Sequence, residues 1–229
     1  MEMQNNHSGI PPLTLPIRSL VSFLRVFFKL LYHQFAWAYG WVASIVSLGA
    51  WQSWVQSVLP YLDGPRTLEI GFGPGHLQVS LHQKGISAYG LDESSQMAQI
   101  TRRRINRLDK SSNLVRGHAQ TLPYANESFH QVVMTFPAEF ILNRQTFTEI
   151  HRVLVNGGAA FILPFAWITG RKPLERAVAR LNRITGEAPD WDERTLEPIK
   201  NLGFDVSWKM ISFSFSKILI IQLNKTSTH

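Results

Sequence analysis

The stretch from Thr67 to Leu77, TLEIGFGPGHL, limits what this chain can fold into more than any other. Its first residues suit a short buried strand, and its glycines suit a tight turn, because glycine adopts positive φ angles at little steric cost. The residues after Pro74 suit a helix, whose first turn presents unpaired backbone N–H groups. The stretch therefore predicts a strand–turn–helix unit in which the backbone passes close to a ligand.

Two nucleotide-binding patterns can be compared with this turn. A dinucleotide-binding fingerprint requires glycine at the first, third and sixth positions. Gly71 and Gly73 occupy the first and third, but His76 occupies the sixth. A P-loop ends in Gly-Lys-Ser/Thr, which does not follow here. The alternative without a ligand is a tight turn in some other α/β protein.

Strand and helix patterns alternate after this unit. Strands are predicted from Thr67 and at 86–91, 113–116, 129–136, 159–164, 204–213 and 215–223. Helices are predicted at 75–84, from Ser94, and at 143–154, 172–185 and 193–201, with residues 156–158 as a helix stop signal. The alternation implies an α/β fold with a mostly parallel sheet and right-handed crossovers.

The N-terminal part divides into two predicted segments before the main domain, which spans residues 63–229. Residues 1–16 are polar and rich in proline, which predicts a flexible lead-in. Residues 17–62 predict a hydrophobic, Trp-rich helical cap. Arg25 and Lys29 interrupt its apolar run, which disfavours a cleaved signal peptide.

The cap allows two interpretations. Its first helix is aromatic on one face and basic on the other, which is typical of a helix in a membrane interface. A helix packed on the domain as a substrate lid would show the same pattern. Residues 30–62 contain no Asp, Glu, Lys or Arg. Polar residues interrupt this segment, whereas a span needs about 20 consecutive apolar residues, so two or three buried helices are favoured.

Composition narrows the function classes. The chain has no cysteine, which excludes disulfides and sites with cysteine ligands, and no pattern of metal ligands is present. Its net charge of +7 indicates an anionic partner, either a nucleic acid or a membrane surface.

In a parallel sheet of this kind, a ligand lies beyond the carboxyl ends of the strands. The predicted strands end there at the glycine turn, at Asp92, at His118 and Ala119, and at Phe136. Asp92 follows the glycines by about 20 residues, the separation at which a carboxylate binds ribose hydroxyls. A helix cap is the alternative role, but Ser94 already supplies that cap.

Four segments in the same order resemble class I S-adenosylmethionine-dependent methyltransferases, and the resemblance covers about residues 32–223. Residues 68–77 resemble motif I of that family, and GLDES at 90–94 resembles motif II. GHAQTLPY at 117–124 is similar to its Gly-Asp-Ala-x-x-Leu-Pro-Phe segment. EIHRVLVNGG at 149–158 is similar to its Glu-x-x-Arg-Val-Leu-Lys-Pro-Gly-Gly element. The closest subgroup resembles ubiquinone/menaquinone-type and other small-molecule methyltransferases.

The resemblance implies a Rossmann-like, doubly wound and mostly parallel seven-stranded sheet, with an antiparallel C-terminal strand and an N-terminal helical lid. It implies S-adenosylmethionine as the cofactor, with the methionine end at Glu69, the ribose at Asp92 and the adenine edge at the Ala119 N–H. The implied cofactor-binding residues are Glu69, Gly71, Phe72, Gly73, Gly75, Asp92, Glu93, Met97, His118, Ala119 and Phe136. His118 departs from the family aspartate, and only its neutral ring can accept a bond from the adenine amino group.

A general base is needed only where the methyl acceptor carries a proton at the working pH. The titratable candidates for contact with the acceptor are Tyr39, His33 and Glu139, followed by Tyr32 and His151. Gly40 stands where related chains often have aspartate.

The leading hypothesis is a methyltransferase for a small hydrophobic acceptor, aromatic or lipid-like, in the cytoplasm, with peripheral contact to the inner face of the membrane through residues 17–54. An inactive cofactor-binding protein that acts at a membrane surface is the first alternative. An RNA methyltransferase is the second, suggested by the arginines at 102–107. No appended RNA module or Asn/Asp-Pro-Pro-Tyr element supports it.

Overall fold

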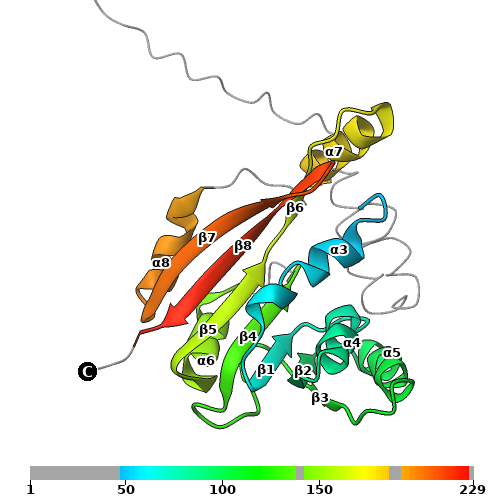
Figure 1. Cartoon of the computed structure of the whole chain (residues 1–229). Coiled ribbons are helices and arrows are strands. Elements are labelled where there is room, and N and C mark those ends of the chain that lie inside the picture. The colour runs from blue at the N-terminus through cyan, green and yellow to red at the C-terminus, as the bar shows by residue number, and fades with distance from the viewer. Residues whose placement is uncertain (1–46, 138–141, 186–191, 227–229) are drawn as a thin grey trace, which may run out of the picture.

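A computed structural model describes residues 47–137, 142–185 and 192–226 of the chain (Figure 1). Its strands are β1 (Arg66–Ile70), β2 (Ser87–Asp92), β3 (Asn113–Arg116), β4 (Phe129–Thr135), β5 (Leu154–Leu163), β6 (Ala166–Ile168), β7 (Phe204–Ser212) and β8 (Ser216–Lys225). Its α-helices are α3 (Trp51–Gln56), α4 (His76–Gln83), α5 (Ser95–Asn106), α6 (Arg144–Val153), α7 (Pro173–Thr185) and α8 (Glu197–Lys200), with 3₁₀ turns η1 (Leu59–Tyr61) and η3 (Glu193–Leu196).

The described strands form one sheet of eight, in the order β3-β2-β1-β4-β5-β8-β6, with β7 paired to β8. Strands β1 to β5 pair in parallel, and β8 runs antiparallel to β5, β6 and β7. The predicted α/β architecture and its antiparallel C-terminal strand are confirmed. The carboxyl ends of the central strands β1, β2 and β4 therefore meet at one edge of the sheet.

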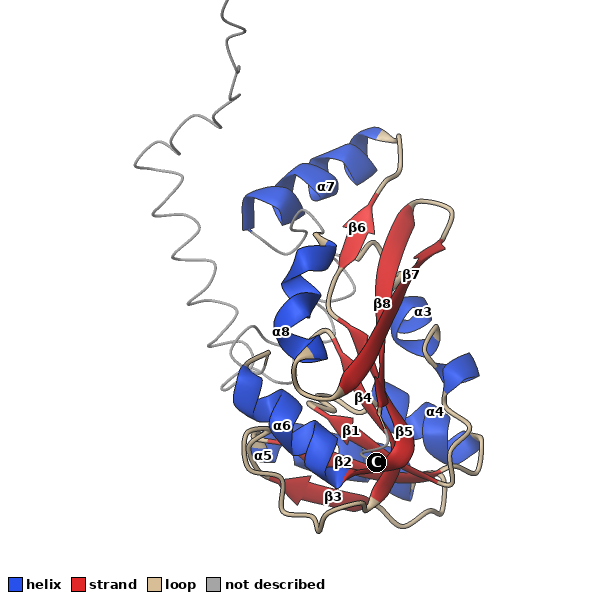
Figure 2. Cartoon of the chain, turned by 90° about the vertical axis from the view of Figure 1, so that its left-hand side faces the viewer, coloured by secondary structure: helices blue, strands red, loops and turns tan. Residues whose placement is uncertain are grey.

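Helices cover both faces of the sheet (Figure 2). Along β4, Val132 and Met134 belong to the apolar cluster that includes Ile150 of α6. Val133 points to the other face and joins a cluster with Trp54 of α3 and with α4. All three β4 side chains are fully buried, as consecutive apolar residues are in a parallel strand covered on both faces.

Local signals set the helix starts. Ser94 Oγ accepts a hydrogen bond from Met97 N at 3.3 Å and caps α5, as predicted. Asn143 Oδ1 accepts one from Thr146 N at 3.0 Å and caps α6. The expected stop signal at 156–158 lies inside β5, because α6 ends at Val153 and the chain enters the strand directly.

The sheet has eight strands rather than the predicted seven because β6 was not expected. This short strand pairs with Ser216–Ile218 of β8, far along the chain, so its order depends on tertiary contacts. The predicted helix at 193–201 divides into η3 and α8.

Much of the N-terminal cap, residues 17–46, lies outside the described residues, as does the lead-in. In the described part of the cap, α3 and η1 are helical. Across residues 47–137, 142–185 and 192–226, none of the helices has the length and apolarity that crossing a bilayer requires.

Candidate functional site

The glycine-rich turn joins β1 to α4 at the carboxyl edge of the sheet. Gly71, Gly73 and Gly75 have φ angles of 74°, 49° and 80°, so each adopts the left-handed region that glycine tolerates best. Two side chains of α5 hold the turn: Thr101 Oγ1 donates to Gly73 O at 2.9 Å, and Arg104 donates to the next carbonyl oxygen at 2.8 Å. The sequence indicated the glycines, but no spacing signal pointed to Thr101 or Arg104.

Gly75→Ala is expected to lower the free energy of unfolding by roughly 2–5 kcal/mol, the sum of left-handed strain and overpacking. A Cβ at Gly75 would overlap the Thr101 side chain, and φ is 80°. Gly73→Ala is the matched control, because its φ is 49° and a Cβ there meets nothing within 4 Å. Urea denaturation of both variants measures the difference. Equal losses would show that the contact with Thr101 is unimportant.

Asp92 ends β2 directly beside this turn. Its side chain is 1% exposed. Oδ2 accepts a hydrogen bond from Gly73 N at 2.8 Å, and Oδ1 accepts one from Ser94 N at 2.8 Å. A carboxylate has about four acceptor sites, and hydroxyl groups are among the donors that it accepts from. The structure brings Asp92 to the turn, and its contact with ribose stays a prediction.

Glu69 is the acidic residue that precedes the turn. Its side chain is 1% exposed, and burial is the main cause that raises its pKa to about 8. The charge of Asp92 raises this pKa further, whereas a hydrogen bond with Gln78 on α4 lowers it. Glu69 Oε2 is buried and has no hydrogen-bond partner among the described residues. A cationic ligand group would supply one.

The loop after β3 lies against Asp92. Gly117 N donates to Asp92 O at 3.1 Å, and Ala119 is buried two residues later. The His118 side chain is 70% exposed, and its Nδ1 lies 3.5 Å from Glu93 Oε2. The predicted residues on β2 and on this loop therefore share one edge of the sheet.

Two predicted apolar residues form a small cluster next to the turn. Phe72, within the turn, and Met97, on α5, are both buried and pack together with Leu114 of β3. The cluster stands apart from the two main apolar clusters of the sheet. Its contact with a nucleoside stays a prediction.

Phe136 follows β4 and has φ 51°, which is rare for a phenylalanine. Its N–H donates to Leu163 O at 2.7 Å. Its ring lies 4.5 Å from the ring of Trp51 and 6.1 Å from that of Trp54, between centroids. The structure thus places Phe136 in an aromatic cluster with α3, a contact that the sequence did not indicate.

Tyr39, His33, Glu139 and Tyr32 lie outside the described residues. His151 is half-buried on α6, where its ring packs edge-on against Phe204 at 5.2 Å, and burial lowers its pKa. Within the described parts of the chain, no group of three or more His, Asp or Glu could hold a metal ion.

The fold and the arrangement of this site resemble those of class I S-adenosylmethionine-dependent methyltransferases. The model of the methyltransferase domain family matches residues 68–162, which run from β1 into β5. This range contains all the predicted cofactor-binding residues. S-adenosylmethionine is the cofactor of the class.

Two bacterial proteins are similar to this chain in sequence. The chain is similar to the uncharacterized methyltransferase YdaC of Bacillus subtilis, with 33% identity over 113 residues, 48% of this chain and 61% of that protein. The chain thus spans less than two thirds of YdaC. It is also similar to the demethylmenaquinone methyltransferase of Tropheryma whipplei, with 27% identity over 75% of this chain and 80% of that protein.

Solved structures share the fold. The YcgJ protein of Bacillus superposes with a TM-score of 0.59 at 14% identity, over 77% of this chain and 99% of that one. The phosphoethanolamine N-methyltransferase 2 of Haemonchus contortus, solved with S-adenosylmethionine, gives a TM-score of 0.59 at 17% identity, over 78% of this chain and 53% of that one.

The described residues fit this cofactor. The buried, unpartnered oxygen of Glu69 suits an ammonium group, as the methionine end carries. The carboxylate of Asp92 is the acceptor type that a diol requires. Gly71 and Gly73 carry no Cβ where the backbone has to approach the ligand.

Proposed function

We propose that this protein transfers the methyl group of S-adenosylmethionine to a small hydrophobic acceptor, aromatic or lipid-like. The observation that carries the proposal is the aromatic cluster of Trp51, Trp54 and Phe136 at the carboxyl end of β4. Aromatic rings supply a large apolar surface and prefer tilted or edge-on contacts with other rings. The cluster would therefore suit a flat, apolar acceptor.

The pairing of β1 with β4 supports this position. Glu69 pairs with Val133, so Phe136 follows β4 at nearly the same level as the glycine turn follows β1. Glu69 and the glycine turn, which would hold the methionine end of the cofactor, therefore lie beside the strand end that carries the aromatic cluster. Water exclusion by such a surface would strengthen the interactions that hold the reacting atoms.

In this reaction, an electron pair of the acceptor atom would form a bond to the methyl carbon while the carbon–sulfur bond breaks. The bonding electron pair goes to sulfur, which becomes a neutral thioether. If the acceptor atom carries a proton, that proton leaves to a base. Because positive charge is lost, the protein contributes chiefly positioning and exclusion of water.

Relatives support this acceptor class. The Tropheryma whipplei protein is named a demethylmenaquinone methyltransferase, and the similar protein of Legionella pneumophila a ubiquinone/menaquinone biosynthesis C-methyltransferase. The basic, aromatic pattern of residues 17–54 supports peripheral contact with the inner face of the membrane, from which such an acceptor would be drawn.

The test is transfer of tritium from methyl-labelled S-adenosylmethionine to reduced demethylmenaquinone, phosphoethanolamine or total RNA. We expect tritium in the organic phase only when the quinol is the acceptor. Transfer should be faster when the quinol is presented in anionic vesicles than in detergent. Asp92→Asn, tested with the same quinol, is the inactive control. Label in phosphoethanolamine or RNA would reassign the acceptor. No transfer by a protein that binds the cofactor would favour an inactive binding protein.

A further inference from the structure

The guanidinium of Arg152, in the last turn of α6, has all its donors engaged. An arginine side chain carries five N–H donors in a planar fork. Nε donates to Glu149 Oε1 at 2.7 Å, and the two terminal nitrogens make four further bonds of 2.7–3.0 Å. Their acceptors are Glu149 Oε2, Asn126 Oδ1, Leu122 O and Tyr124 O.

Glu149 completes this arrangement. Besides its two bonds with Arg152, its Oε2 accepts a hydrogen bond from Leu122 N at 2.7 Å. The hydrogen bond from Arg152 is the main cause that holds the Glu149 pKa below its usual value; the hydrogen bond from Leu122 N and the charge of Arg152 lower it further. Glu149 and Arg152 together therefore hydrogen-bond the N–H and the carbonyl of Leu122 and the carbonyl of Tyr124.

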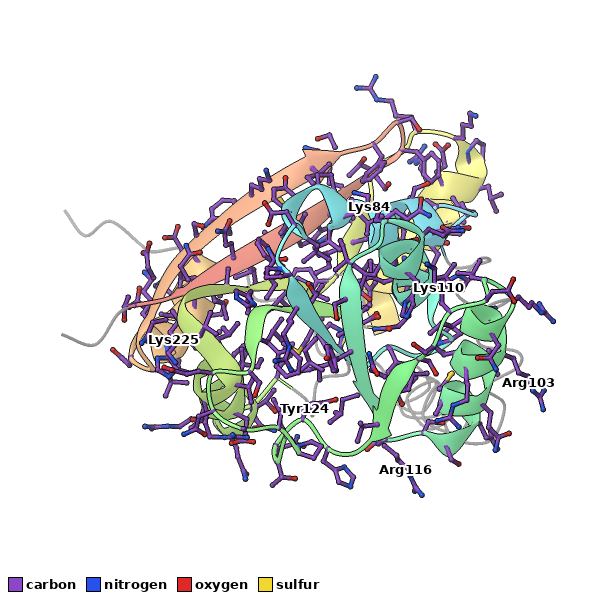
Figure 3. The ribbon with its side chains drawn as sticks, turned by 60° about the horizontal axis from the view of Figure 1, so that its bottom comes forward. Lys84, Arg103, Lys110, Arg116, Tyr124 and Lys225 are labelled. Carbon is purple, nitrogen blue, oxygen red and sulfur yellow. The ribbon has the colours of Figure 1, made fainter. Side chains whose placement is uncertain are left out.

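These contacts fix the far end of the loop that follows β3. The near end is tied by Gly117 N to Asp92 O, and Thr121 N closes a turn on His118 O at 3.1 Å. In Figure 3, the loop can be followed from the labelled Arg116, the last residue of β3, to the labelled Tyr124. Ala119, buried between the two ties, is held from both sides.

We propose that Glu149 and Arg152 are positioning residues that set the selectivity of the site for the adenine edge of the cofactor. The inference rests on the cofactor assignment and on the implied role of the Ala119 N–H. That N–H would donate to adenine N1, an acceptor. In the deaminated base, hypoxanthine, N1 carries a hydrogen and cannot accept. Discrimination between the two bases requires that Ala119 be held at a defined distance, because hydrogen bonds weaken steeply with poor geometry.

Arg152→Lys is the sharpest variant because lysine keeps the charge but has three donors and no fork. Calorimetry measures the dissociation constants of S-adenosylhomocysteine and S-inosylhomocysteine. We expect the wild type to prefer the adenine compound, and Arg152→Lys to reduce that preference at least tenfold. Glu149→Gln, which keeps the shape but loses charge, is expected to act in the same direction and serves if Arg152→Lys does not fold.

Glu197→Gln is the matched control, because Glu197 and Lys200 form another i,i+3 pair, at 2.8 Å on α8. Its preference should equal that of the wild type. General destabilisation would weaken the binding of both ligands alike and leave the ratio of their dissociation constants unchanged. An unchanged ratio in a folded Arg152→Lys or Glu149→Gln protein therefore overturns the inference. A wild type that binds both ligands equally also overturns it. A wild type that binds neither overturns the cofactor assignment instead.

Discussion

Asparagine in place of Asp92 is expected to weaken S-adenosylmethionine binding by about 100-fold, since hydrogen bonds to a charged group contribute roughly 1.5–3 kcal/mol each. The carboxylate accepts N–H bonds from Gly73 and Ser94 at 2.8 Å, and its predicted role is to accept further bonds from the ribose diol. An amide has only one acceptor oxygen, so its NH₂ group must face an N–H or a hydroxyl at this site. Calorimetric titration at pH 8 measures the change.

Asp205→Asn provides the control for loss of one negative charge, because Asp205 is exposed on β7, away from the turn. We expect it to bind the cofactor as the wild type does. A folded Asp92→Asn protein with unchanged affinity would remove Asp92 from the cofactor site. Thermal melts of both variants distinguish lost binding from lost folding.

Glu69 should make cofactor binding depend on pH. Its pKa in the free protein is about 8, so below pH 8 the carboxyl is protonated and must lose its proton to pair with an ammonium group. We expect affinity to fall as pH decreases from 8 to 6, approaching tenfold per pH unit. Above pH 8 the ligand amino group, with an ordinary pKa of about 7.7–8.0, loses its own proton. Affinity should therefore peak near pH 8.

Glu69→Gln is expected to abolish the decline on the acid side, because the amide does not titrate. Calorimetry between pH 6 and pH 9 compares this variant with the wild type and with His118→Asn. If the decline persists in Glu69→Gln and disappears in His118→Asn, the imidazole is responsible and the role given to Glu69 is wrong.

The same pKa has a consequence for stability. Because the folded pKa of about 8 lies above the ordinary value of 4.5, the contribution of Glu69 to stability is complete below pH 4.5 and is lost as pH rises through 8. At pH 7 this loss amounts to ~3 kcal/mol. Glu69→Gln should therefore raise the free energy of unfolding at pH 7 by about that amount and change it little at pH 4.5. Urea denaturation at both pH values tests this, and equal effects at both would contradict it.

Short-range sequence patterns were sufficient to predict much of the fold. Glycines that must adopt positive φ marked the turn after β1, and a side-chain oxygen before a helix marked Ser94 as a cap. The strand predicted at 129–136 contains the apolar run Val132–Met134, which is fully buried in the structure. These features depend on neighbouring residues or on burial of a whole segment, so they can be read along the chain.

Contacts between distant segments could not be read in this way. The family element at 149–158 was recognised, but not that Arg152 would reach the carbonyls of Leu122 and Tyr124. No pattern in the sequence pointed to Thr101 or Arg104, yet both donate hydrogen bonds to backbone carbonyls of the glycine turn. The contact of Phe136 with Trp51 was not predicted, and the contact of Phe136 with the cofactor stays a prediction.

The sequence by itself determined the strand–turn–helix unit, the parallel sheet and the edge at which Glu69, Asp92 and Ala119 meet, because strand order and backbone preference follow from local pattern. Only the tertiary structure decided that Glu69 is buried with an unpartnered oxygen and a raised pKa, since desolvation depends on everything packed around a group. The tertiary structure likewise decided that α6 hydrogen-bonds the loop after β3, because hydrogen-bond geometry between distant segments exists only once the chain has folded.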